Sequence, residues 1–410
     1  MRILWLKSEL LHPVDKGGKI RTYQMLCALA RDHHVTYLCL DDGSAAPDAL
    51  ARSREYAQET VVVPFAPPAK GSGRFYGALF TNLFTSLPYA IARYRSAAFQ
   101  HQLTRLAPSA DIIVCDFLTT SINVVASLQR HAVLFQHNVE AVIWRRHATV
   151  PQNALRRAYM WMQWKRMERF ESAACRRFAH VVAVSEADAQ LFRDDYGVKS
   201  VSDVPTGVDL DYFSPAADST RNPAELMFVG SMDWMPNDEG IRWFAAEVFT
   251  RVQQQIPEAK LTIVGRLPSA AMRALAAQNP AIEVTGTVPD VRPYLQRAAL
   301  SVVPLRIGGG TRLKIYEAMA AGTPIVSTTI GAEGLPVRHG EHLRLADSPV
   351  EQAAAIVQLL RQPAEARRLA DNARAYVERH CSWDAVARQF ISQCLAARPA
   401  SAKSHEEQWV

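Results

Sequence analysis

A run of small residues followed by two cations carries the clearest chemistry in this chain. Residues 308–311 read Gly-Gly-Gly-Thr, after a buried strand that ends near residue 304, and a helix is expected over residues 312–321. Glycines let the backbone approach a ligand closely, and a helix N-terminus attracts anions through its free N–H groups and its dipole. Together with Arg312 and Lys314 in the first turn, this segment predicts a binding site for a diphosphate.

Glu317 is the unusual residue of the same helix. From Leu313 onward the helix is apolar apart from Lys314 and Glu317, which indicates that it is buried. A buried carboxylate is costly without partners, and the two hydroxyl groups of a sugar diol would satisfy it. The alternative is an ion pair with Lys314, which lies three residues earlier on the same helix face.

Further candidate residues come directly after predicted strands. Ligands of open parallel sheets bind beyond the carboxyl ends of the strands, so these positions can face a ligand. Gly18 lies where a helix begins after the first strand, and His137 follows the strand expected over residues 132–136. A loop histidine with only structural contacts is the alternative for His137. In the second half of the chain, the corresponding residues are Gly230, Ser231, Arg266 and Val288.

Short apolar strands alternate with helix-length segments through almost the whole chain, which predicts an α/β fold with parallel, helix-covered sheets. Strands are expected over residues 2–6, 35–40, 61–64, 111–115, 132–136, 180–184, 225–229, 260–264, 282–284, 300–303 and 324–327, and helices include residues 121–129 and 237–254. Two such series predict two doubly wound, Rossmann-like domains, residues 1–208 and 209–380. A final helix and a polar tail follow in residues 381–410.

The composition is that of a globular protein. Of the 410 residues, 49% are hydrophobic and 21% are charged, and no apolar run approaches the length of a membrane span. The first seven residues resemble a strand more than a secretory signal. Because the six cysteines form no Cys-x-x-Cys pair, we expect neither a disulfide scaffold nor a zinc site, and a cytoplasmic location follows as the expectation.

Positive charge is concentrated in the first half of the chain. Residues 1–208 contain 25 Lys and Arg against 18 Asp and Glu, and residues 60–110 contain no acidic residue. In residues 60–110 and again in 144–169, basic residues alternate with aromatic ones. Such segments suit the surface of an anionic membrane and, less well, nucleic acid, whereas two ordinary solvated helices are the alternative. We expect contact with an anionic membrane and no nucleic-acid partner.

The glycines after the first strand, His137, the segment 205–209 and the residues Glu317-Ala318-Met319-Ala320-Ala321-Gly322-Thr323-Pro324 resemble the retaining glycosyltransferases of family 4. The segments 230–234 and 308–314 are most similar to members that act on exopolysaccharide or other surface glycans. The resemblance implies the GT-B fold, in which two Rossmann-like domains face each other across a cleft, and it extends over nearly the whole chain.

The resemblance also implies roles for the candidate residues. The second domain would bind a nucleotide-diphosphate sugar, with Glu317 on the ribose hydroxyls and Val288 near the base. His137 would lie beside the transferred sugar, and Gly18 would approach the phosphates. Gly309, Gly310 and Thr311 would meet the sugar or the diphosphate, and Gly230, Ser231 and Arg266 complete the expected donor site. The first domain would bind the acceptor, and the last helix, residues 383–397, would cross back to it.

Two departures from the family pattern concern the donor site. Many members carry an acidic residue eight positions before the second glutamate, where this chain has Gly309. Many also carry Arg and Lys in the loop after the first strand of the second domain, whereas residues 231–237 contain neither. Arg312 and Lys314 are therefore our candidates for neutralising the diphosphate.

We therefore expect a retaining, metal-independent glycosyltransferase with no cofactor beyond its nucleotide-sugar co-substrate. The acceptor would be a glycan, in our expectation lipid-linked, and the enzyme would work at the inner face of the cytoplasmic membrane. A nucleotide-sugar epimerase of the same fold and a non-catalytic nucleotide-sugar-binding protein are the alternatives.

Overall fold

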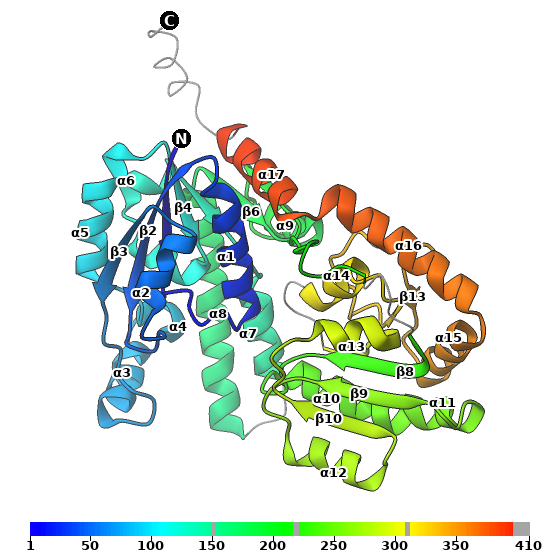
Figure 1. Ribbon diagram of the computed structural model, residues 1–410. Coiled ribbons are helices and arrows are strands. Elements are labelled where there is room, and N and C mark those ends of the chain that lie inside the picture. The colour runs from blue at the N-terminus through cyan, green and yellow to red at the C-terminus, as the bar shows by residue number, and fades with distance from the viewer. Residues whose placement is uncertain (150–152, 216–220, 308–311, 397–410) are drawn as a thin grey trace, which may run out of the picture. The chain divides into compact units, whose positions relative to one another are not determined.

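The computed structural model describes residues 1–149, 153–215, 221–307 and 312–396 (Figure 1). The chain forms two compact units, of which the first combines Met1–Pro205 with the chain from Trp383 onward and the second is Thr206–Ser382. The limits of the second unit thus fall after Pro205 and Ser382, where we had predicted residues 208 and 380. Each unit is built on one parallel sheet, so the prediction of two doubly wound α/β domains is confirmed.

The first unit contains a seven-stranded sheet in the order β3-β2-β1-β4-β5-β6-β7. The strands are β1 (Arg2–Lys7), β2 (His34–Asp41), β3 (Glu59–Pro64), β4 (Ile112–Asp116), β5 (Ala132–Phe135), β6 (His180–Ala183) and β7 (Val201–Asp203). All neighbouring strands are parallel, and the strand order reverses between β1 and β4. Ligands of such sheets bind at this reversal, beyond the carboxyl ends of the two strands.

Helices cover both faces of this sheet. The helices of the unit are α1 (Gly17–Leu29), α2 (Ala49–Arg52), α3 (Gly73–Leu83), α4 (Tyr89–Ala92), α5 (Ala97–Leu106), α6 (Ala126–Gln129), α7 (Glu140–Thr149), α8 (Ala154–Arg177), α9 (Glu186–Asp194) and α17 (Trp383–Ala396). Alternate residues of β1 enter different cores: Leu4 and Leu6 pack with α5 and α8, whereas Ile3 and Trp5 pack with α1 and α17. The last helix of the chain is therefore part of the first unit, beside α1 (Figure 1).

The predicted helix over residues 121–129 is wrong. The chain instead makes a 3₁₀ turn at Leu118–Asn123, becomes extended at Val124 and Val125, and then forms the short α6. Two adjacent β-branched residues favour this extended link, since their χ1 freedom is restricted in a helix.

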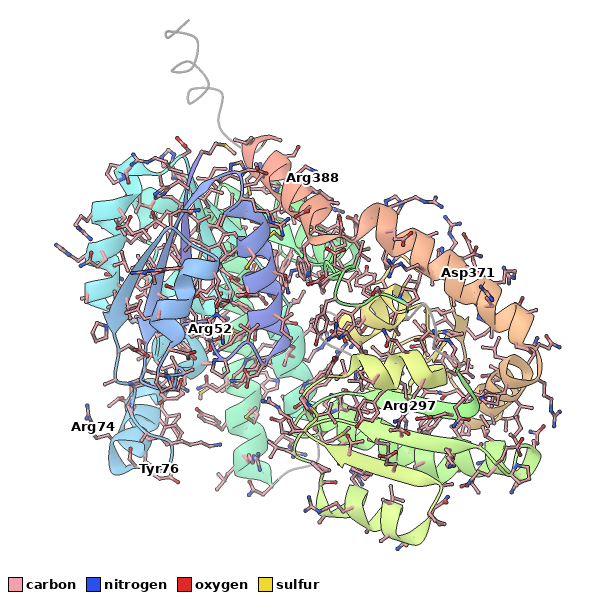
Figure 2. The ribbon with its side chains drawn as sticks, viewed as in Figure 1. Arg52, Arg74, Tyr76, Arg297, Asp371 and Arg388 are labelled. Atoms are coloured by element: carbon pink, nitrogen blue, oxygen red, sulfur yellow. The ribbon has the colours of Figure 1, made fainter. Side chains whose placement is uncertain are left out.

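Helix α3 leaves an apolar stripe in solvent. Tyr76, Phe80 and Phe84, spaced four residues apart, are 62%, 62% and 79% exposed. Figure 2 shows Arg74 and Tyr76 projecting outward from this helix. Residues 60–110, the segment without acidic residues, therefore present both aromatic rings and a cation at the surface.

The second unit contains a six-stranded parallel sheet in the order β10-β9-β8-β11-β12-β13. Its strands are β8 (Asn222–Val229), β9 (Lys260–Val264), β10 (Ile282–Gly286), β11 (Ala298–Val303), β12 (Ile325–Ser327) and β13 (Arg344–Leu345). The helices are α10 (Met235–Trp243), α11 (Thr250–Gln255), α12 (Ala270–Gln278), α13 (Arg292–Arg297), α14 (Leu313–Ala320), α15 (Pro349–Arg361) and α16 (Pro363–His380). The predicted helix over residues 237–254 is interrupted, because Phe244–Phe249 adopt π-helical geometry. The strand order reverses between β8 and β11, which defines a second candidate ligand edge.

Candidate active site

Six of the predicted donor-site residues lie just beyond the carboxyl ends of β8, β9 and β11: Gly230, Ser231, Arg266, Arg312, Lys314 and Glu317. The loops after β8 and β9 touch each other, because a Cβ added to Gly265 would lie 1.7 Å from the carbonyl oxygen of Gly230. A Cβ on Gly230 would meet Nδ2 of Asn237 at 2.7 Å and Nζ of Lys314 at 2.9 Å. The structure thus brings the bare backbone of Gly230 against a lysine of helix α14.

Lys314 is held in place from two sides. Its Nζ donates a hydrogen bond to Oδ1 of Asn237 over 2.7 Å and lies 4.3 Å from the ring centroid of Phe228. Asn237 in turn donates from Nδ2 to the carbonyl oxygen of Ser231 over 2.8 Å. Burial lowers the pKa of Lys314 to about 7, and the positive charge of Arg312 acts in the same direction. An incoming anion would restore the ammonium form, since an opposite charge favours it.

Asn237 was missed by the sequence analysis. It is buried in the first turn of α10, directly after the loop that begins at Gly230. A polar residue at the start of a helix that follows a candidate phosphate loop was the available signal. The structure adds its function, because Asn237 ties the loop after β8 to the lysine of α14.

Arg312 occupies a different position from the one predicted. Helix α14 begins at Leu313, and Arg312 precedes it with a left-handed backbone at φ 50°. Its side chain is 4% exposed, and Nη2 lies 3.4 Å from Oε2 of Glu333. The predicted contributions of Gly309, Gly310 and Thr311, including the cap by Thr311, lie outside the described residues.

Glu317 does not form the alternative ion pair. Among the described residues, no donor lies within hydrogen-bonding distance of its carboxylate, and Lys314 bonds to Asn237 instead. Burial raises the pKa of Glu317 to about 7, against the opposing effect of Lys314. A half-buried carboxylate without such a donor can accept hydrogen bonds from hydroxyl groups of a ligand.

Ser231, Arg266 and Asp233 form a small cluster beside this site. Nε of Arg266 donates to Oγ of Ser231 over 2.7 Å, and Nη2 lies 3.3 Å from Asp233. Arg266 therefore places a guanidinium in the loop region that lacks Arg and Lys of its own. Val288 lies in the loop after β10, where it packs half-buried on the cluster that contains Val264 and Leu295.

The first unit places Gly18 and His137 around one aromatic ring. Helix α1 begins at Gly17, and a Cβ added to Gly18 would lie 2.7 Å from Cζ of Phe117. The ring of Phe117 also stacks on His137, with the ring centroids 4.0 Å apart. A side chain at position 18 would therefore have to displace the ring of Phe117, so packing favours glycine here whatever its contact with a ligand.

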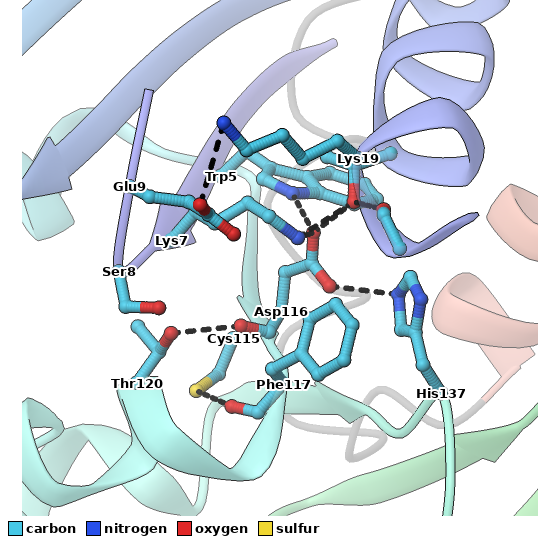
Figure 3. Close-up of polar contacts among 12 residues, drawn as sticks. Trp5, Lys7, Ser8, Glu9, Lys19, Cys115, Asp116, Phe117, Thr120 and His137 are labelled. Carbon is cyan, nitrogen blue, oxygen red and sulfur yellow. Dashed lines mark hydrogen bonds and ion pairs between the residues drawn. The ribbon is translucent and has the colours of Figure 1, made fainter. Parts of the chain in front are cut away.

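A buried charge network supports this arrangement (Figure 3). Asp116, at the end of β4, accepts hydrogen bonds from Lys7 over 2.8 Å, from Thr22 over 2.7 Å and from the indole of Trp5 over 3.0 Å. Lys7 ends the neighbouring strand β1, and its ammonium group lies 4.3 Å from the ring centroid of Phe117. Burial alone would raise the pKa of Asp116, but the nearby Lys7 and His137 hold it below its usual range. The carboxylate is thus ionised in the core.

His137 contacts the same carboxylate. Its Nε2 lies 2.8 Å from Oδ1 of Asp116, and the ring is also packed against Phe135. Burial lowers the pKa of His137 to about 4, although Asp116 opposes this effect. The imidazole is therefore neutral at neutral pH. A neutral ring that faces an ionised carboxylate carries its proton on Nε2, so Nδ1 can accept one hydrogen bond from a ligand.

Two family models match the chain. The model described as Glycosyltransferase Family 4 matches residues 16–212, and the model described as Glycosyl transferases group 1 matches residues 223–362. The chain belongs to glycosyltransferase family 4. The family assignment made from the sequence is thus confirmed, and the chain is a glycosyltransferase.

Curated relatives agree with this assignment. The chain is 20% identical over 387 residues to an uncharacterized 44.6 kDa protein in the cps region of Klebsiella pneumoniae, covering 92% of this chain and 95% of that protein. It is 28% identical over 241 residues to the MMP α-(1→4)-mannosyltransferase of Mycolicibacterium hassiacum. That match covers 56% of this chain and 57% of the mannosyltransferase.

Solved structures show the same fold. Sucrose-phosphate synthase from Thermosynechococcus elongatus superposes with a TM-score of 0.72 at 21% identity, covering 97% of this chain and all of that one (100%). Anabaena Alr3699/HepE in complex with UDP superposes with a TM-score of 0.69 at 15% identity, with the same coverage of 97% and 100%. The predicted GT-B fold is therefore confirmed. Among the described residues, no helix has the length and apolar character needed to cross a membrane.

Proposed function

We propose that this glycosyltransferase moves a sugar from a nucleotide-diphosphate donor to a hydroxyl group of a glycan acceptor, with retention of anomeric configuration. The observation that carries the proposal is the meeting of Gly230, Lys314 and Asn237 beside the half-buried carboxylate of Glu317. It supplies a cation and open backbone for a diphosphate, and an acceptor for the ribose hydroxyls. The complex of Alr3699/HepE with UDP supports a nucleotide donor.

In the proposed reaction, the bond between the anomeric carbon and the diphosphate oxygen breaks while the acceptor oxygen bonds to the same carbon on the same face. The leaving phosphate oxygen takes the acceptor proton. Lys314 and Arg312 stabilise the negative charge that develops on the diphosphate, which is the largest usual contribution to such catalysis. His137 contacts the transferred sugar, Gly18 approaches the phosphates and Val288 lies near the base. The reaction requires no metal and no further cofactor.

The pH dependence of donor use follows from two coupled groups. Lys314, whose pKa is about 7, loses its ammonium form as the pH rises, and Glu317, whose pKa is also about 7, loses its ionised form as the pH falls. We expect kcat/KM for the donor to peak near neutral pH and to fall on both sides. In a Lys314→Arg variant the alkaline fall should disappear, since a guanidinium stays charged. If kcat/KM for the donor still falls above neutral pH in the Lys314→Arg variant, the proposed role of Lys314 is contradicted.

A lipid-linked acceptor in surface-polysaccharide synthesis is the biological part of the proposal. The relative encoded in the cps region of Klebsiella pneumoniae supports a role in surface glycans. The exposed rings of α3 and the acid-free segment around them support contact with the inner face of the cytoplasmic membrane. An enzyme held at this surface would meet a lipid-linked acceptor directly.

Binding to phosphatidylglycerol vesicles tests the membrane contact. We expect the wild-type chain to co-sediment with these vesicles, to release as salt rises and to ignore phosphatidylcholine vesicles. Because burying one phenylalanine contributes about 1.5–3 kcal/mol, the Phe80→Ser/Phe84→Ser variant should bind at least roughly tenfold more weakly. Val350→Ser, at a position 66% exposed in the second unit, is the control and should bind like wild type. Binding that ignores both salt and lipid charge would refute this contact.

Product analysis tests the reaction itself. A thermal-shift screen of nucleotide sugars identifies the donor, because a ligand that favours the folded state raises the melting temperature. The donor is then incubated with lipid-linked glycan, and NMR of the product reports the anomeric configuration. Conversion of the donor without acceptor would indicate an epimerase, and donor binding without any transfer would indicate a non-catalytic protein. An inverted linkage would refute the retaining mechanism.

A further inference from the structure

The first unit contains a cavity of about 530 Å³ between α7, α8 and α9. This volume lies within the range of small-ligand sites in proteins. One face of α8 supplies Trp164, Glu168, Arg169, Ser172 and Arg176, at spacings of three or four residues. The other walls are Ala141, Val142 and Arg145 of α7, Leu191 of α9, and Asp195 and Tyr196 just after it. None of these residues belongs to the donor or acceptor groups described above.

The walls of the cavity are fixed from behind by a buried carboxyl group. Oε1 and Oε2 of Glu171 accept hydrogen bonds from the backbone N–H groups of Glu140 and Ala141 over 2.8 and 2.9 Å, which ties α8 to the start of α7. The hydroxyl of Tyr196 donates to Oε2 of the same residue over 3.0 Å. The cavity is therefore formed by connected elements.

Positive charge dominates the cavity. Arg176 is held in position by Oγ of Ser172 at 2.8 Å and the carbonyl oxygen of Tyr196 at 3.0 Å. Glu168 is already matched by Lys165 at 2.9 Å. Arg145 and Arg169 are exposed, and among the described residues neither has an acidic or hydrogen-bonding partner. Asp195 is the remaining acid, so the two unmatched guanidinium groups favour an anion.

Trp164 helps to decide what kind of anion fits. Lys165 covers one face of its ring, with Nζ 4.1 Å from the centroid, and the ring packs half-buried on the apolar core. One face of the ring is therefore taken by a cation and is not open for stacking on a neutral sugar. The hydroxyl of Ser172 and the carboxylate of Asp195 remain as hydrogen-bonding groups for hydroxyls. The lining thus combines recognition of an anion with recognition of a polyol.

We propose that this cavity binds a sugar unit that carries a carboxylate or a phosphate, with Arg145 and Arg169 on the anion. The inference rests on the proposed function, because the natural source of such a unit would be the acceptor glycan bound by the first unit. The basic-aromatic segment 144–169, interpreted from the sequence as membrane surface, then has a second role. Its Arg145, Trp164 and Arg169 converge on the cavity.

Calorimetric titration of the full chain, with its donor site saturated by the nucleoside diphosphate of the donor found in the thermal-shift screen, tests the proposal. The probes are D-glucuronate, D-glucose 6-phosphate, D-glucose and inorganic phosphate. We expect the two anionic sugars to bind, and Arg145→Gln/Arg169→Gln to weaken them by roughly tenfold or more, since a hydrogen bond to a charged group contributes about 1.5–3 kcal/mol. The control is Arg177→Gln, an exposed residue of α8 outside the cavity, which should bind as wild type does.

Several results would overturn the proposal. They are no binding of either anionic sugar, unchanged binding in Arg145→Gln/Arg169→Gln, or equal affinity for D-glucose. Inorganic phosphate that binds as tightly as D-glucose 6-phosphate would refute recognition of the sugar. Binding of the anionic sugars by a Lys314→Met chain separates this cavity from the donor site. If the Lys314→Met chain loses donor use but still binds the anionic sugars, the donor site and the cavity are independent, and a failure of one proposal does not refute the other.

Discussion

Replacing Lys314 by methionine is expected to lower the rate of sugar transfer by roughly 10²–10³, the cost of removing one donor that stabilises a developing oxyanion. Methionine keeps most of the length and apolar character of the lysine stem. It removes the ammonium group that bonds to Asn237 and lies against Gly230. Because this charge acts on the leaving diphosphate, kcat should fall more than the affinity for the donor. Single-turnover transfer with the donor found in the thermal-shift screen measures the effect.

A lysine at the opposite end of the same sheet provides the control. Lys260 is exposed at the first residue of β9, whereas the candidate site lies beyond the carboxyl end of that strand. Lys260→Met should transfer sugar at the wild-type rate. If Lys314→Met folds normally and keeps full turnover, the assignment of Lys314 to the leaving group is wrong.

Five of the six strands of the second unit were predictable because each is a short apolar run flanked by turn residues, whereas the two-residue β13 was missed because it has no such run. The prediction of β9 over residues 260–264 matches Lys260–Val264, and α14 differs from its predicted bounds by one residue at each end. Glycine and proline at positions 322 and 324 end the helix, as their backbone properties require. The local sequence therefore determines the bounds of β9 and α14, and tertiary contacts shift these bounds by at most one residue.

The contacts of the site were less predictable, because they join residues that are far apart in the chain. Lys314 and Glu317 have the spacing of an ion pair, yet the lysine bonds to Asn237, which lies 77 positions earlier. Nothing in the local pattern of either segment indicates that pairing. It follows from the parallel order of β8 and β11, which brings the loops after both strands to one edge.

The first unit shows the same limit more clearly. Lys7 and Asp116 are 109 positions apart, and each looks like an ordinary charged residue at the end of a strand. Strand register pairs Leu6 with Cys115, so the next residues along both strands are the lysine and the aspartate. Once the sheet order is known, the charge pair can be expected; from the sequence alone only the strands can.

Replacing Asp116 by alanine is expected to destabilise the first unit by about 3–5 kcal/mol, because it would leave a buried ammonium without its counter-charge. Lys7 is 1% exposed, so its ammonium group is shielded from solvent in the folded state. Thr22 and the indole of Trp5 would also lose their shared acceptor. Hydrogen exchange of the backbone amides in β1 and β4 measures the change directly in the strands that carry the pair.

Two further variants separate charge from packing. Asp384→Ala removes one partner of the exposed ion pair with Arg31, whose atoms lie 2.9 Å apart, and should cost less than about 1 kcal/mol. The double variant Lys7→Met/Asp116→Ala removes both buried charges. Its loss of stability should therefore be smaller than the sum of the losses measured for Lys7→Met alone and for Asp116→Ala alone. Additive losses would mean that Lys7 and Asp116 act independently. In that case the carboxylate would orient His137 without depending on the lysine, and the network in Figure 3 would be two separate contacts.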